Sequence, residues 1–94
     1  MSVIPDTSAH AVWARLAQMP AGWFIAMHDG RRYGVTRSVH ASGRSMKLFG
    51  EELGGPDRIS LNIFAPAAGE PVLKPCEMPV DKVTEFVLGA VVES

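Results

Sequence analysis

The chain has 94 residues, of which 47% are hydrophobic and 20% are charged. These values are typical of a globular protein and argue against a disordered, collagen-like or coiled-coil chain. Lys and Arg together number 9 and Asp and Glu number 10, so the formal charge of −1 gives no strong field that would attract nucleic acid or a membrane. We expect one small globular domain over residues 1–94, because a chain of this length buries roughly 60–70% of its unfolded surface around one core.

Cysteine usage and the first residues indicate the compartment. The single cysteine, Cys76, cannot form an intramolecular disulfide, and residues 1–10 lack the basic and apolar regions of a signal peptide. The longest apolar runs, at residues 21–27 and around Leu88, are far shorter than the ~20 residues that span a bilayer. We therefore expect a cytoplasmic protein that is not inserted into a membrane.

Helical spacing first appears over residues 8–19, where Val12, Leu16 and other apolar residues recur on one side. Ser8 and the two residues before it are suitable N-caps, and Pro20 is incompatible with continuation of the helix. The pattern therefore predicts a first helix over residues 8–19.

The dipeptide Asp29-Gly30 lies between two strand-like runs, residues 23–28 and 31–39. It is typical of a two-residue hairpin turn, because both turn positions need a positive φ. Further strands are predicted at residues 45–49, 58–64 and 71–74. The last of these belongs at a sheet edge, because its prolines cannot donate hydrogen bonds to a ladder.

A second helix is predicted near the C-terminal end of the sequence. Pro79 suits its first turn, and an apolar stripe of valines continues the helical spacing as far as Val92. Short connections and the absence of a β-α-β pattern favour a meander of strands. The predicted fold class is α+β: an antiparallel sheet of four to five strands, with an N-terminal and a C-terminal helix packed on one face.

The hairpin turn also predicts a register. If Asp29 and Gly30 are the turn residues, three pairs share one face: His28 with Arg31, Ala26 with Tyr33, and Phe24 with Val35. The apolar majority on that face directs it toward the helices. We therefore expect Trp13, on the first helix, to be inside and Trp23 to be outside.

The opposite face of the sheet then carries large apolar side chains mixed with polar and basic ones. A contiguous exposed patch of this kind is typical of an interaction site. We predict a binding face formed by Trp23, Ile25, Met27, Arg32, Lys47, Phe49, Asn62 and Phe64. Its expected ligand is a protein partner or a second copy of the chain. The alternative is that long loops or the C-terminal residues cover this face, or that a bulge slips the strand by one residue and moves Trp23 into the core.

A basic run suggests a second hypothesis. Between Gly30 and Gly50 there is no acidic residue, and the basic residues there are Arg31, Arg32, Arg37, Arg44 and Lys47. Basic sheet surfaces with aromatic residues bind single-stranded nucleic acid in many proteins, and residues 31–47 could act in this way. Strand alternation places these basic residues on different faces, however, and a solvated strand rim is the simpler interpretation.

Cys76 suggests a third hypothesis, a cysteine-dependent enzyme, because it precedes a helix N-terminus that would favour a thiolate. Such an enzyme also needs a general base, and the sequence does not link His10, His28 or His40 to Cys76. Free cysteines usually act as small buried hydrophobes, so we prefer a structural role for Cys76. No spacing typical of a metal site occurs, and no cofactor or catalytic residue is predicted.

Overall fold

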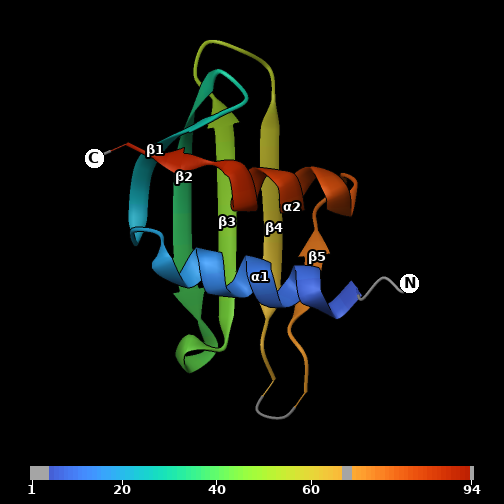
Figure 1. Ribbon diagram of the computed structural model, residues 1–94. Helices are drawn as coiled ribbons and strands as arrows, with labels where there is room; N and C mark the ends of the chain where they lie inside the picture. Colours follow the sequence, from blue (N-terminus) through green and yellow to red (C-terminus); the bar gives the residue numbers. More distant parts are fainter. Residues whose placement is uncertain (1–4, 67–68, 94) are drawn as a thin grey trace.

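The computed structural model describes residues 5–66 and 69–93. Within these residues, the strands form a six-stranded antiparallel sheet in the order β5-β4-β3-β2-β1-β6. In chain order the elements are α1 (Pro5–Gln18), β1 (Gly22–His28), β2 (Arg31–His40), a 3-10 turn (Ala41–Gly43), β3 (Ser45–Glu52), β4 (Arg58–Phe64), β5 (Val72–Pro75), α2 (Val80–Gly89) and β6 (Val91–Val92). Figure 1 shows both helices crossing the same face of the sheet, which confirms the predicted α+β fold.

The two faces of the sheet have different surroundings. We call the face under α1 and α2 the inner face and the opposite one the outer face; neither helix covers the outer face (Figure 1). Among the described helices, none has the length and apolar character needed to cross a membrane.

Helix α1 begins at Pro5, earlier than the predicted start at Ser8. Proline is favoured in the first turn of a helix, because the N–H that it lacks would have no helical partner there and its φ is already helical. Val12 and Leu16 are buried, as their spacing predicts, whereas Trp13 is only partly buried at the margin of the core.

The hairpin between β1 and β2 has the predicted turn and register. Asp29 and Gly30 have φ values of 55° and 78°, the left-handed conformations that a type I′ turn requires. His28 pairs with Arg31 next to the turn, and the same register continues along both strands until Gly22 pairs with Arg37. Four residues on the helix-facing side of this hairpin are buried: Phe24, Ala26, Tyr33 and Val35.

Strands β3 and β4 continue the alternation across the sheet. Met46 and Leu48 are buried on β3, and Ile59, Leu61 and Ile63 are buried on β4. Helix α2 contributes Val83, Phe86 and Val87 to the same hydrophobic core. Strand β5 is an edge strand, as its prolines predict.

The C-terminal end of α2 differs from the prediction. The helix ends at Gly89, and Ala90 is extended with φ −71° and ψ 141°. Val91 and Val92 then form β6, which pairs with Met27 and Ala26 of β1. Glycine is a poor helix former and β-branched valine favours strands, so the helical spacing of the valines was a misleading signal here. The sheet consequently has one strand that the sequence did not predict.

Candidate functional site

The outer face contains all residues of the predicted binding face. Trp23, Ile25 and Met27 lie on β1, Arg32 on β2, Lys47 and Phe49 on β3, and Asn62 and Phe64 on β4. Their neighbours along each strand point under the helices, so these side chains lie on the uncovered side. Trp23 is 63% exposed, Phe64 43% and Phe49 38%, whereas Ile25 and Met27 are partly buried.

Trp23 is held in place by its neighbours on the outer face. A Cβ atom on Gly34 would lie 3.2 Å from Cζ2 and Nε1 of Trp23 and 3.3 Å from Cδ2 of Leu53. The indole ring therefore lies over the glycine of the adjacent strand and beside Leu53. The absence of a side chain at Gly34 provides the space that this position of the ring requires. Trp23 is thus an exposed aromatic residue with defined packing.

Two further apolar residues belong to this surface and were not predicted. Leu53, which is 43% exposed, follows β3, and its N–H donates to the carbonyl of Arg32 at 2.8 Å. Val91, which is 64% exposed, lies opposite Met27 on β6. The sequence placed Leu53 in a loop and Val91 in a helix. We call Trp23, Ile25, Met27, Phe49, Leu53 and Val91 the outer apolar cluster.

Arg32 crosses this cluster to reach an acidic residue. Its Nε and Nη2 donate to the Glu93 carboxylate at 3.0 and 3.1 Å. Because β1 lies between β2 and β6, this ion pair spans β1 on the outer face. The hydrogen bonds from Arg32 lower the pKa of Glu93 below its ordinary value. Arg32 is therefore already neutralised by a carboxylate of its own chain.

The basic run over residues 31–47 does not form one patch. Arg31 and Arg37 share the inner-face register of Tyr33, while Arg44 follows the 3-10 turn. Arg37 donates from Nε to the carbonyl of Pro20 at 3.2 Å and from Nη1 to Sδ of Met46 at 3.3 Å. Lys47 is the one residue of the run that lies on the outer face without an ion pair to another described residue. This distribution weakens the electrostatic argument for a nucleic-acid surface.

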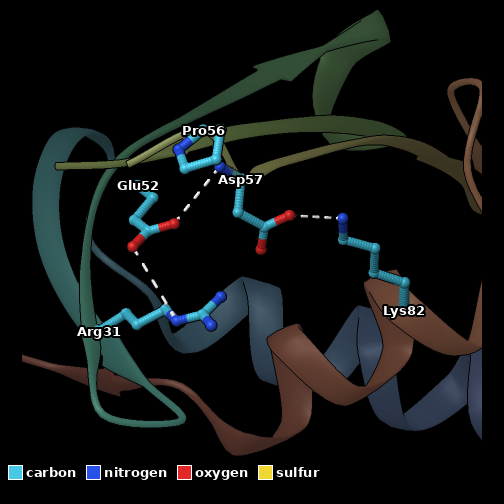
Figure 2. Close-up of a pocket in the computed structure, with 5 residues that line it drawn as sticks. All are labelled: Arg31, Glu52, Pro56, Asp57 and Lys82. Carbon is cyan, nitrogen blue, oxygen red and sulfur yellow. Dashed lines mark hydrogen bonds and ion pairs between the residues drawn. The ribbon is translucent and has the colours of Figure 1, made fainter. Parts of the chain in front are cut away.

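A second candidate site is a charged pocket at one end of the sheet, which the sequence did not predict. It has a volume of about 450 Å³ and is lined by Arg31, Glu52, Pro56, Asp57 and Lys82. Figure 2 shows Arg31 and Lys82 on opposite sides of the pocket, with the Asp57 carboxylate between them. These residues come from β2, the end of β3, the β3–β4 connection and the first turn of α2, so only the fold brings them together.

Hydrogen bonds and ion pairs join the charged groups of this pocket. Nζ of Lys82 donates to Oδ1 of Asp57 at 2.5 Å, and the Tyr33 hydroxyl donates to Oδ2 at 2.6 Å. Nε of Arg31 lies 3.9 Å from Oε2 of Glu52. The Lys82 bond, and then the Tyr33 bond, lower the pKa of Asp57 below its ordinary value. The Coulombic effect of Glu52 is the largest of those that raise the pKa of Arg31.

The pairing within this pocket limits its chemistry. Each carboxylate already accepts a hydrogen bond or lies beside a cation, and the phenol of Tyr33 is a donor to Asp57. A general base or an anion-binding site needs a group that is available to the substrate. The arrangement is instead that of a polar contact that fastens the first turn of α2 to the β3–β4 connection.

Cys76 lies beside the outer face. It follows β5, its N–H donates to the carbonyl of Ser60 at 3.0 Å, and its Sγ accepts from Nδ2 of Asn62 at 3.6 Å. The thiol is partly buried in a small pocket of about 290 Å³. No hydrogen bond in residues 5–66 and 69–93 joins it to a histidine.

The histidines have other partners. His10 contacts Glu70, His40 contacts Ser38 at 2.9 Å, and the His28 ring meets Phe86 edge-on. In the part of the chain that the structure describes, no cluster of three or more His, Cys, Asp or Glu side chains could hold a metal ion. The positions of Cys76 and of the histidines therefore provide no nucleophile and base within contact of each other.

Comparison with known proteins found no matching family model, no matching curated protein and no matching solved structure.

Proposed function

We propose that the protein is a protein-binding module that contacts its partner through the outer face. The observation that carries this proposal is the position of Trp23, which is 63% exposed on the uncovered side of the sheet and yet packed against Gly34 and Leu53. An exposed apolar cluster costs free energy in water unless a partner covers it. Tryptophan residues held in a fixed position commonly provide much of the binding energy at interfaces.

The composition of the surrounding surface supports the same proposal. The outer apolar cluster is bordered on β3 and β4 by polar and charged residues, among them Lys47, Ser60 and Asn62. A central apolar region with a polar rim is the usual anatomy of a protein interface. The charged pocket of Figure 2 offers less support for binding, because its groups are occupied by one another.

We also propose that this binding occurs in the cytoplasm. The support is the single cysteine of the chain, which is a free thiol next to Asn62. Free thiols persist in reducing compartments, whereas secreted proteins of this size more often contain disulfides. Cell fractionation followed by immunoblotting tests the location, and recovery in a secreted or membrane fraction would contradict it.

Site-specific photo-crosslinking in cells that express the protein tests the binding face. With p-benzoylphenylalanine in place of Phe49, irradiation is expected to give protein adducts whose yield falls when Trp23→Glu is added. The matched control carries the crosslinker in place of Glu85, which is exposed on α2. Equal adducts from both positions, or none from position 49, would contradict the proposal. An adduct that nuclease treatment removes would support the nucleic-acid hypothesis instead.

A further inference from the structure

One row of the outer face carries two lysines that have no acidic neighbour. Lys47 of β3 pairs with Asn62 of β4, and Asn62 pairs with Lys74 of β5, so their side chains lie next to one another on the same face. All three residues are exposed, and neither lysine forms an ion pair with another residue in the described ranges 5–66 and 69–93. We call these residues the lysine row. Neighbouring strands are about 4.8 Å apart, so the Cα atoms of the two lysines are roughly 10 Å apart.

Apolar side chains border the lysine row on both sides. Phe49, which belongs to the outer apolar cluster, lies two residues from Lys47 along β3. On the other side, Phe64 and Val72 form a register pair, and each lies two residues beyond the row on its own strand. Both side chains are exposed. The positive charges of the row therefore lie between two apolar parts of one surface.

We infer that the partner of the outer face is another protein with an acidic segment, which places carboxylates over the lysine row and apolar side chains over the residues that border it. The inference rests on the proposed function, because it names the chemistry of the partner of that same surface. Lysine carries its charge on a flexible four-carbon stem, so both ammonium groups can reach carboxylates above Asn62. Asn62 donates from Nδ2 to Sγ of Cys76 at 3.6 Å, and an amide nitrogen has a second hydrogen for another acceptor. The row thus offers ammonium and amide donors to one short acidic segment.

Charge complementarity is the argument for an acidic partner. The residues adjacent to the two lysines on the outer face, in register or two positions along the strand, carry no negative charge: Ser38, Ser45, Phe49, Asn62, Val72 and Cys76. No described residue therefore neutralises the row, in contrast to Arg32, which donates to the Glu93 carboxylate. Opposite charge on a partner would speed association and fix the register of the complex.

The same face argues against a long polyanion as the partner. A nucleic-acid strand or an anionic lipid surface carries repeated negative charges, and its binding depends on basic residues at many contacts. Here the lysines lie in one row, while Glu51 and Glu93 are exposed elsewhere on the outer face. Glu51 is four residues from Lys47 along β3, a distance of roughly 13 Å. A short acidic segment contacts the lysines without reaching these carboxylates.

Charge reversal in the crosslinking experiment tests the inference. With p-benzoylphenylalanine in place of Phe49, Lys47→Glu and Lys74→Glu are each expected to lower the yield of protein adducts about tenfold, because like charges at an interface are repulsive. Arg44→Glu is the matched control. It changes the net charge by the same amount at an exposed position after the 3-10 turn, so the yield should stay the same.

A water-soluble carbodiimide tests the contact itself. This reagent joins a lysine amine to a carboxylate in contact with it through an amide bond, and is itself converted to a urea. In extracts of the same cells, it is expected to link Lys47 or Lys74 to an Asp or Glu residue of the partner, as identified by mass spectrometry. The double variant Lys47→Arg/Lys74→Arg keeps both positive charges but has no amine at these positions. Its photo-adduct should therefore persist, while its carbodiimide link should be lost.

These outcomes separate the inference from the proposed function, and circular dichroism checks that every variant is folded. Adducts from position 49 that both charge reversals leave unchanged, or that carry no carbodiimide link to the row, would overturn the inference and leave the proposed function standing. An adduct with a second copy of the chain would have the same meaning. A nuclease-sensitive adduct, or the absence of any adduct from position 49, would contradict both.

Discussion

The Tyr33 hydroxyl donates a hydrogen bond to Oδ2 of Asp57 at 2.6 Å, although these residues are 24 positions apart in the chain. Tyr33 is only 2% exposed and also packs edge-on against Phe86, with ring centroids 4.9 Å apart. Burial, followed by the hydrogen bond to Asp57, raises the pKa of Tyr33 to about 12. The fold therefore favours the neutral phenol.

This pKa predicts how the stability changes in alkali. Tyr33 is the single tyrosine of the chain, so tyrosinate absorbance near 295 nm reports on it alone. We expect a midpoint near pH 12 in the folded protein and near pH 10 in denaturant. Because this pKa is raised in the folded state, the contribution of Tyr33 to stability is complete below about pH 10 and is lost as pH rises toward the folded pKa. The loss in the free energy of unfolding is at most ~1.4 kcal/mol per pH unit. A native midpoint near 10, with the circular dichroism spectrum unchanged, would contradict this.

The lowered pKa of Asp57 predicts that the protein loses stability in acid. Its pKa is lowered by Lys82 and Tyr33, so its contribution to stability is present above the ordinary pKa of about 3.9 and is lost as pH falls through the lower folded value. We expect Asp57→Asn to lower the free energy of unfolding by about 1–2 kcal/mol at pH 7 and by less at pH 3. Urea unfolding at both pH values measures the difference. Asp81→Asn, an exposed change in the first turn of α2, is the matched control and should have little effect.

The contact between Trp23 and Gly34 predicts the effect of one added methyl group. In Gly34→Ala, the new Cβ would lie 3.2 Å from the indole, so the ring has to move away from β2. We expect acrylamide to quench Trp23 more strongly in this variant, measured in a Trp13→Phe background. Ser38→Ala, on the same strand and face but farther from the glycine, should leave the quenching nearly unchanged. Equal quenching of Gly34→Ala and its parent would show that the indole does not rest on the glycine.

The two tryptophans are expected to differ in their access to a quencher. Trp13 is partly buried beside the core, whereas Trp23 is 63% exposed on the outer face. In dilute solution, acrylamide should quench Trp23 more strongly than Trp13, as measured in the single-tryptophan variants Trp13→Phe and Trp23→Phe. Equal quenching of the two tryptophans would contradict the exposure of Trp23 on the outer face.

Local signals were sufficient for the sheet register and for the outer face. Asp29 and Gly30 favour one turn geometry, and that turn determines which side of the hairpin every residue occupies, including Trp23. Strand alternation then placed Lys47, Phe49 and Phe64 correctly without any knowledge of distant contacts. The prediction succeeded where the determining interactions lie between neighbours in the sequence.

Features that depend on distant residues were not predicted. Val91 continues the helical spacing of Val87, and only pairing with Met27 makes it part of a strand. The charged pocket likewise joins Arg31, Asp57 and Lys82, which no local pattern relates to one another. Both cases require the folded arrangement of elements, because the stabilising partner lies far away along the chain.

Strand β6 has a consequence for folding and aggregation. Its pairing with β1 closes a loop that contains most of the chain, whereas β2, β3 and β4 each pair with the strand before them. The entropy of closing a long loop makes this contact a late step in folding and an early one in unfolding. Until β6 is in place, β1 has an open edge at Ala26 and Met27. Such edges recruit strands from other molecules, so β6 protects the folding chain from aggregation.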